Sequence, residues 1–227
     1  MKKYIFLILL TLYSSQAKQI NIAAAANLAK VIYELKDEYQ KHYKDAINIT
    51  LNSSGALVFQ IQNNAPYDIF MAANEEFANS LNKKDTKLYA KGCLAFYSKT
   101  KIKNEKDIKN IISSSNCVVI ANPKTAPYGQ AAYDYIVKND LYDIFKSKQI
   151  IAHSISHALQ QAKNGCDASF VALSNVLFDT TIKKENYVNI GCDIKQNVVL
   201  LNENAKDFYD FLDSQKAKEI FVKYGYE

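Results

Sequence analysis

Short apolar runs alternate with amphipathic segments along this chain, and this alternation limits the fold more than any other feature of the sequence. Gln19–Ala24 and Ile47–Leu51 have the length and apolar content of strands. Residues 28–43 lie between them and place apolar side chains three and four positions apart, which predicts a helix. Strands that alternate with helices are typical of parallel β-α-β units, so we predict an α/β fold.

The same alternation continues to the C-terminus. Further strands are expected at residues 67–72, 94–97, 118–121, 150–151, 169–173 and 198–201, and further helices at 56–62, 128–138, 156–163, 205–215 and 216–224. This pattern fits one doubly wound sheet or two smaller α/β lobes. In the second case Gly92 and the region of Val198 are the expected crossings between the lobes.

The first seventeen residues have the composition of a secretory signal peptide. Lys2 and Lys3 form a charged start, Tyr4–Leu12 is apolar, and Ser15 and Ala17 supply small residues at the positions that signal peptidase reads. The apolar stretch is too short to span a bilayer, and no cysteine follows it to carry a lipid anchor. We therefore expect cleavage after Ala17 and a mature chain that is exported to the periplasm.

Every basic residue in this chain is a lysine, and the formal net charge is only +5. Without arginine the chain has no guanidinium group to bind phosphate or guanine in a bidentate manner, so nucleic-acid binding is not expected. The chain has four cysteines: Cys93, Cys117, Cys166 and Cys192. An even number in an exported protein permits disulfides, but buried free thiols fit equally well, so their pairing is left open.

Four segments share one local design, in which a strand end is followed by small or polar residues and then by a helix. They begin at Ala25, Asn52, Ala126 and Ser154. The first N–H groups of a helix have no partner within it, and together with the helix dipole they attract anions. Asn and Ser are also the commonest helix caps, and most caps bind only their own backbone. A single segment of this kind is therefore no evidence of a ligand, whereas four of them favour an anion site.

These segments give the chain a resemblance to a known family. The matching stretches are NIAAAANLAKVIYEL from Asn21, LNSSGALVFQI from Leu51, NNAPYDIFMAAN from Asn63, ANPKTAPYGQAA from Ala121, SFVALSNV from Ser169 and AKEIFVKYGY from Ala217. In their order and spacing they resemble the periplasmic molybdate-binding proteins, the solute receptors of molybdate ABC transporters. The resemblance implies a two-lobed periplasmic binding protein of type II, with a ligand cleft between the lobes. Lobe 1 would comprise residues 18–91 plus 199–227, and lobe 2 residues 92–198.

The resemblance also implies which residues contact the ligand. They would be Ala26 and Asn27 through backbone N–H groups, Asn27 also through its side chain, Ser54 through its hydroxyl and N–H, and Tyr128 and Ile155 through backbone N–H groups. Many relatives have Ser or Thr near the first two positions, and some have Tyr where Ala172 stands here. The chain therefore offers fewer hydroxyl donors than those relatives.

A set of neutral donors suits molybdate, a dianion whose oxygens only accept hydrogen bonds at neutral pH. Phosphate usually keeps a proton and needs an acceptor, and none of the four segments contains Asp or Glu. We expect an extracytoplasmic receptor, a monomer without a cofactor or metal other than the oxyanion, that delivers molybdate or tungstate to an ABC permease in the inner membrane. The alternative is a receptor for another tetrahedral oxyanion such as tungstate or sulfate.

The competing class is an exported serine hydrolase. Ser53 or Ser54 would be the nucleophile, with His42, His153 or His157 as the base. The chain has no G-x-S-x-G motif, so no catalytic residue is assigned and the chain is not expected to be an enzyme. His153 and His157 have the spacing of a zinc pair but lack the Glu of a metalloprotease, and are expected as polar residues near the rim of the cleft.

Overall fold

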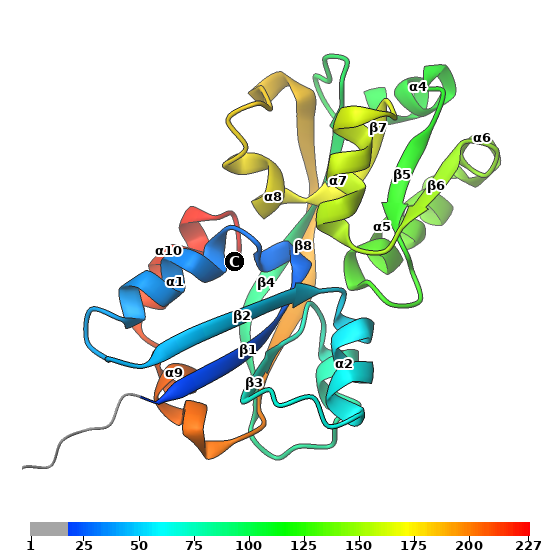
Figure 1. The fold of residues 1–227 in the computed structure, drawn as a ribbon. Helices are drawn as coiled ribbons and strands as arrows, with labels where there is room; N and C mark the ends of the chain where they lie inside the picture. The colour runs from blue at the N-terminus through cyan, green and yellow to red at the C-terminus, as the bar shows by residue number, and fades with distance from the viewer. Residues whose placement is uncertain (1–17) are drawn as a thin grey trace, which may run out of the picture.

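The computed structural model describes residues 18–227, so the predicted signal peptide and its cleavage after Ala17 lie outside the described residues. The described strands form one eight-stranded sheet in the order β2-β1-β3-β8-β4-β7-β5-β6 (Figure 1). The strands are β1 (Gln19–Ala25), β2 (Ala46–Asn52), β3 (Ile69–Met71), β4 (Thr86–Ser98), β5 (Val118–Ala121), β6 (Gln149–Ala152), β7 (Ala168–Ala172) and β8 (Tyr187–Leu200).

Helices cover both faces of this sheet. They are α1 (Val31–Tyr39), α2 (Ser54–Gln62), α3 (Glu75–Asn79), α4 (Asp107–Ser114), α5 (Pro127–Lys138), α6 (Tyr142–Phe145), α7 (Ile155–Asn164), α8 (Leu173–Leu177), α9 (Lys206–Phe211) and α10 (Gln215–Lys223). Single 3-10 turns lie at η1 (Ala26–Leu28), η2 (Lys184–Asn186) and η3 (Glu203–Ala205). The helix expected over residues 28–43 is shorter at both ends: Leu28 belongs to η1, and α1 begins at Val31 and ends at Tyr39.

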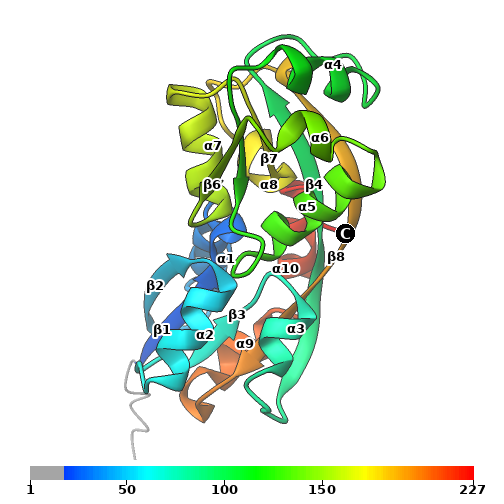
Figure 2. The ribbon, with the colours of Figure 1, turned by 90° about the vertical axis from the view of Figure 1, so that its right-hand side faces the viewer.

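The strand pairing divides the sheet into two halves. β1 is parallel to β2 and β3, and β5 is parallel to β6 and β7. Between them lie β4 and β8, which are antiparallel to each other and to β7 and β3, respectively. In Figures 1 and 2 these two long strands run from the lobe that holds β1 to the lobe that holds β5. The predicted α/β fold with two lobes is therefore confirmed.

The two connecting strands are much longer than the sequence predicts. The expected strands at 94–97 and 198–201 are only the apolar ends of β4 and β8. Around the crossing, Ala90–Gly92 pairs with Ile194–Gln196, where glycine and charged residues interrupt the apolar pattern. These residues extend as strands because the partner strand satisfies their backbone groups, which local sequence does not reveal.

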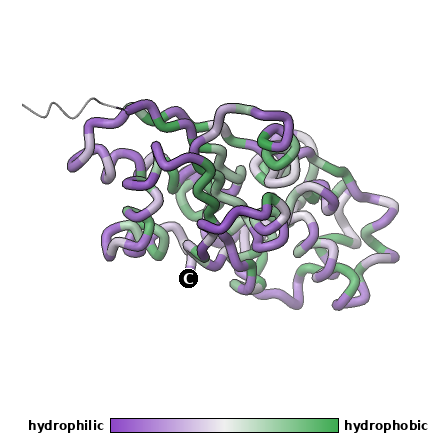
Figure 3. Tube along the Cα trace, turned by 90° about the horizontal axis from the view of Figure 1, so that it is seen from below, coloured by the Kyte–Doolittle hydropathy of each residue, from purple (hydrophilic) through white to green (hydrophobic). Residues whose placement is uncertain are grey.

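Each lobe has a hydrophobic core on either face of its sheet. In the first lobe, α1, α9 and α10 cover one face, with Ile22, Leu35 and Phe208 fully buried, and α2 and α3 cover the other. In the second lobe, α4, α5 and α6 pack against one face and α7 and α8 against the other. The trace in Figure 3 is hydrophobic mainly in its interior and hydrophilic along the outer turns. Among residues 18–227, no helix has both the length and the apolar character needed to cross a bilayer.

Candidate functional site

The first part of the site lies where β1 ends. β1 and β2 are parallel with Ala25 opposite Asn52, so the segments that follow both strands meet at one edge of the sheet. After β1 the chain turns into η1, whose residues Ala26 and Asn27 are buried. The run of alanines before η1 has no side chain beyond Cβ, which leaves the backbone accessible to a small ligand.

Ser54 is the first residue of α2 and not its cap. Ser53 occupies the cap position, and its side chain makes no capping hydrogen bond. Ser54 is 1% exposed, and its hydroxyl accepts a hydrogen bond of 3.0 Å from the backbone N–H of Ala73. Within the described residues its hydroxyl hydrogen has no acceptor of its own, so the group is held in place with its donor free.

The second lobe contributes two helix starts. Pro127 is the first residue of α5, and Tyr128 follows it. Gly129 allows this helix start to lie against β5, because a Cβ atom at that position would stand 2.3 Å from the carbonyl oxygen of Ala121. Ile155 begins α7, where the Ser154 hydroxyl caps the helix by accepting from the N–H of His157 at 3.3 Å.

All five residues predicted as ligand contacts line one small cavity between the lobes. The full lining comprises Ala25, Ala26, Asn27, Ser53, Ser54, Ala73, Ala126, Pro127, Tyr128 and Ile155. None of these side chains carries a charge at neutral pH. Burial, the largest influence, holds the pKa of the Tyr128 phenol well above its usual value near 10, so this group stays neutral as well.

The backbone of this cavity is rich in free donors. Within residues 18–227, the N–H groups of Asn27, Ser54, Tyr128 and Ile155 have no hydrogen-bond partner. Three of them stand in the first turn of a helix, where the dipole favours negative charge. Buried N–H groups without partners are costly, so four of them around one cavity indicate a ligand that accepts hydrogen bonds.

The side chain of Asn27 has a different role from the predicted one in this structure. Its two N–H groups donate to Gln196 Oε1 at 2.9 Å and to the Tyr226 hydroxyl at 3.0 Å. Its Oδ1 atom is buried and has no partner among the described residues. The backbone N–H of Asn27 therefore remains as its free donor toward the cavity.

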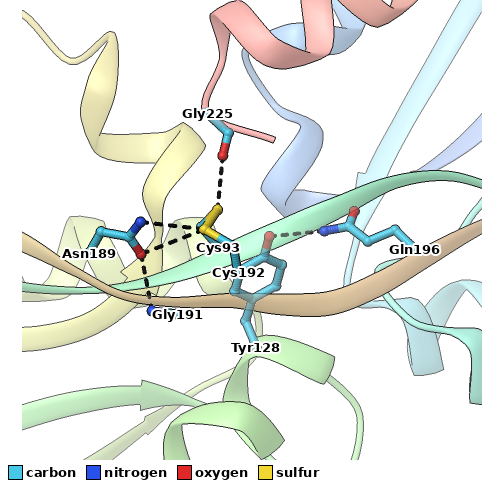
Figure 4. The surroundings of a disulfide bond; sticks show 7 residues. All are labelled: Cys93, Tyr128, Asn189, Gly191, Cys192, Gln196 and Gly225. Carbon is cyan, nitrogen blue, oxygen red and sulfur yellow. Dashed lines mark hydrogen bonds between the residues drawn. A yellow bond between two sulfur atoms is a disulfide. The ribbon is translucent and has the colours of Figure 1, made fainter. Parts of the chain in front are cut away.

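Gln196 links both lobes at the crossing of β4 and β8. Its Nε2 donates to the Tyr128 hydroxyl at 2.9 Å, and its Oε1 accepts from Tyr89 at 2.6 Å as well as from Asn27. Figure 4 shows Gln196 pointing at Tyr128 across the connecting strands. A Cβ atom on Gly92 would lie 2.0 Å from both groups, so only glycine leaves room for this contact.

Sequence reasoning missed Gln196 and Tyr226. Gln196 lies in a polar stretch of β8 that resembles a loop, and Tyr226 is the residue before the last. Nothing in their local sequence marks them as neighbours of Asn27. Both are brought there by long-range pairing with β4: Gln196 pairs with Ala90, and Glu227, which follows Tyr226, exchanges backbone hydrogen bonds with Lys91.

The lobes touch each other around the cavity. Gly55 donates its N–H to the carbonyl of Thr125 at 2.9 Å. From the second lobe, the hydroxyls of Ser156 and Ser174 donate to the carbonyls of Ala26 and Asn27 at 2.7 and 2.9 Å. The two lobes are thus closed on each other. The sequence does not predict whether the lobes are open or closed.

The cysteine pairing left open by the sequence is resolved as two disulfides. Cys93 on β4 is bonded to Cys192 on β8, next to the crossing, and Cys117 is bonded to Cys166 at the beginnings of β5 and β7 (Figure 4 shows the first). Among the described residues the only cluster of three potential metal-ligating groups is Cys93, Cys192 and Glu227, and the disulfide occupies both of its thiols.

The histidine pair lies outside the cavity. The rings of His153 and His157 stand 4.3 Å apart, at the start of α7. No histidine or carboxylate lines the cavity, so none of its described residues could deprotonate Ser53 or Ser54.

Comparison with known proteins agrees with this geometry. Residues 20–227 match the family of bacterial extracellular solute-binding proteins. The molybdate-binding protein ModA of Azotobacter vinelandii is 31% identical over 94% of this chain and 91% of its own length, and ModA of Rhodobacter capsulatus is 28% identical over 92% and 88%. The solved structure of the Azotobacter vinelandii periplasmic molybdate-binding protein superimposes with a TM-score of 0.84 at 24% identity, over 92% of this chain and 98% of that one. This chain therefore belongs to the bacterial extracellular solute-binding proteins.

Proposed function

We propose that this protein is an extracytoplasmic receptor that binds molybdate, and tungstate with it, in the cavity between its lobes. The observation that carries the proposal is the convergence of Asn27, Ser54, Tyr128 and Ile155, with free backbone N–H groups, on one uncharged cavity. The 31% identity with ModA of Azotobacter vinelandii over nearly the whole chain supports molybdate as the ligand.

The donors proposed for the anion come from both lobes. The first lobe would supply the N–H groups of Ala26 and Asn27 and the N–H and hydroxyl of Ser54. The second lobe would supply the N–H groups of Tyr128 and Ile155. Such neutral donors stabilise a dianion without a buried counter-charge, and no lysine lines the cavity.

The chemistry of the cavity favours a fully deprotonated oxyanion. Hydrogen phosphate carries a proton that needs an acceptor, and the cavity lining holds no carboxylate. Sulfate has the same valence as molybdate but is smaller, so fewer donors would reach it at once. Tungstate is nearly the size of molybdate, and neutral donors at fixed positions have no means of separating the two.

We propose the lobe division that the sequence predicts, with residues 18–91 plus 199–227 in one lobe and 92–198 in the other. The buried side chain of Val198 packs with the core of the first lobe, so Val198 itself would belong to that lobe and the second lobe would end just before it. After cleavage following Ala17, the mature chain would act in the periplasm as a monomer and deliver its anion to an ABC permease in the inner membrane.

A hydrolase has less support. Ser54 has a hydroxyl free to donate, but it has no general base beside it in the cavity. A serine nucleophile needs such a base, because the hydroxyl is a weak nucleophile at its ordinary pKa.

Thermal melting of the mature chain in the presence of oxyanions tests the proposal. A ligand that binds only the native state stabilises it by RT ln(1 + [L]/Kd), so a ligand at 100 times its Kd adds about 2.7 kcal/mol. Molybdate and tungstate should raise the melting temperature at micromolar concentration, and sulfate and phosphate should not. A shift with phosphate but not with molybdate would overturn the proposal.

A further inference from the structure

The carbonyl groups of Ala26 and Asn27, in the first lobe, accept hydrogen bonds from side chains of the second lobe. Ser156 on α7 donates its hydroxyl to the carbonyl of Ala26 at 2.7 Å. Ser174 on α8 donates its hydroxyl to the carbonyl of Asn27 at 2.9 Å. Neither serine lines the cavity, so neither belongs to the proposed set of anion donors.

Two further side chains orient these hydroxyls. Asn175 donates its Nδ2 to Ser156 Oγ at 3.0 Å, which leaves the hydrogen of that hydroxyl for the Ala26 carbonyl. The Tyr226 hydroxyl lies 3.1 Å from Ser174 Oγ and 3.0 Å from the carbonyl oxygen of Asn27. Ser174 and Tyr226 are both 3% exposed, so water does not compete for these bonds in the closed structure.

The contact at Ala26 acts on the same peptide group as the anion would. The carbonyl of Ala26 and the N–H of Asn27 belong to one peptide unit, and this N–H is free and lines the cavity. A hydrogen bond accepted by the carbonyl polarises the unit and strengthens donation by its N–H, by about 10–30%. The hydroxyl of Ser156 therefore both fixes the loop and makes its N–H a better donor.

We propose that Ser156 and Ser174 are positioning residues that latch the anion loop in the closed state and set how long the anion stays bound. The inference rests on the proposed function. Both bonds join one lobe to the other, so separation of the lobes would break them. The two serine hydroxyls and the two carbonyls would then be exposed to water. Interactions made only in one of two states shift the equilibrium toward that state by their own free energy.

The latch predicts a change in release rate. A neutral hydrogen bond contributes a net 0.5–1.5 kcal/mol, which corresponds to about 2- to 12-fold in an equilibrium constant. Ser156→Ala and Ser174→Ala should each speed the release of molybdate by about that factor and leave the association rate nearly unchanged. Ser156→Thr, which keeps the hydroxyl, should restore slow release.

A matched control separates this role from an ordinary structural hydrogen bond. Ser115 is also buried and donates its hydroxyl to a backbone carbonyl, that of Ile111 at 2.7 Å, but within the second lobe alone. Ser115→Ala should lower the melting temperature of the unliganded protein and leave molybdate release unchanged. Ser156→Ala and Ser174→Ala should speed molybdate release and leave the melting temperature of the unliganded protein unchanged.

The experiment is stopped-flow tyrosine fluorescence of the mature chain with molybdate, paired with melting of the unliganded proteins. Faster release by Ser156→Ala and Ser174→Ala, with rescue by Ser156→Thr, supports the latch. Wild-type release rates in both alanine variants would overturn the latch alone. If the wild-type chain bound no oxyanion, the proposed function would fall and the latch with it.

Discussion

The hydroxyl of Ser54 accepts a hydrogen bond from the backbone N–H of Ala73, with 3.0 Å between oxygen and nitrogen. Ala73 follows β3, and Ser54 begins α2, so this bond ties together two segments at the carboxyl edge of the sheet. It fixes the oxygen of Ser54 while its hydrogen stays free to donate into the cavity. Ser54 therefore presents a hydroxyl to the cavity whose oxygen is anchored and whose hydrogen is free to donate.

Replacement of Ser54 should weaken molybdate binding strongly. A hydrogen bond to a charged group contributes roughly 1.5–3 kcal/mol, so Ser54→Ala should lower affinity about 10- to 150-fold. Ser54→Asp should be worse, because its carboxylate would repel the dianion and the chain has no arginine to offset it. Calorimetric titration of both variants measures the effect.

The Ser54→Ala variant also leaves the N–H of Ala73 without its acceptor, which should cost about 1–3 kcal/mol of folding stability. Ser214→Ala is the matched control, because Ser214 caps α10 by accepting from the N–H of Ala217 at 3.1 Å. It should lower stability by about 1 kcal/mol and leave molybdate affinity intact. Full-strength binding by Ser54→Asp would rule out the proposed anion contact.

Gly92 should tolerate no side chain. A Cβ atom there would lie 2.0 Å from Gln196 Nε2 and from the Tyr128 hydroxyl, so Gly92→Ala must displace the link between the lobes. Overpacking of this kind costs about 1–3 kcal/mol, and the displaced Tyr128 should also weaken anion binding. Gly165→Ala is the control, since its Cβ would meet its nearest neighbour at an ordinary 3.7 Å. Equal melting temperatures and affinities for the two variants would contradict this account.

The two disulfides should stabilise the protein unequally. Cys93–Cys192 closes a separation of 99 residues and Cys117–Cys166 one of 49. Loss of either, by paired substitution with serine, should cost about 2–5 kcal/mol. Since each doubling of loop length adds about 0.6 kcal/mol of closure entropy, the first loss should be the larger by about that amount. Urea unfolding measures both, and a larger loss on removal of Cys117–Cys166 would contradict the prediction.

Glu34 should make stability depend on pH in the acid range. Hydrogen bonds from Lys223, at 2.7 and 2.8 Å, and from Tyr224, at 2.8 Å, hold the pKa of Glu34 below its ordinary value of 4.5. A lowered carboxyl pKa stabilises the native state above the ordinary value, and this contribution is lost as the pH falls through the native pKa. The Glu34→Gln variant lacks this contribution. The difference in free energy of unfolding between wild type and variant should therefore be constant at neutral pH and shrink below pH 4.5. Urea unfolding at several pH values tests this, and a gap that widened on acidification would contradict it.

The parts of the fold that follow from local pattern could be predicted, and those that depend on distant partners could not. Strand β5 is at the predicted residues and α5 begins within one residue of its predicted start, because their apolar spacing is unbroken. The sequence prediction covers only the apolar end of β8. The alternation of Val188, Ile190 and Ile194 with exposed polar residues is a local strand signal that the prediction did not use, and pairing with β4 extends the strand over that stretch.

The candidate site shows the same division. The five predicted contacts follow strand ends, where short sequence stretches carry the signal, and the structure brings all five to one cavity. Gln196 and Tyr226, which hold Asn27, come from a connecting strand and from the C-terminus. The disulfide pairing needed three-dimensional proximity for the same reason, since a separation of 99 residues leaves no local trace.

Isothermal titration of the wild-type chain from Lys18 onward with molybdate tests the central claim most directly. We predict that one molybdate binds per chain and that tungstate competes for the same single site. Phosphate should bind weakly or not at all. Affinity should be flat between about pH 6 and 9, because no group in the cavity titrates there and burial keeps the pKa of Tyr128 above that range. An absence of molybdate binding, or binding of phosphate at equal strength, would contradict a cavity built from neutral donors for a dianion.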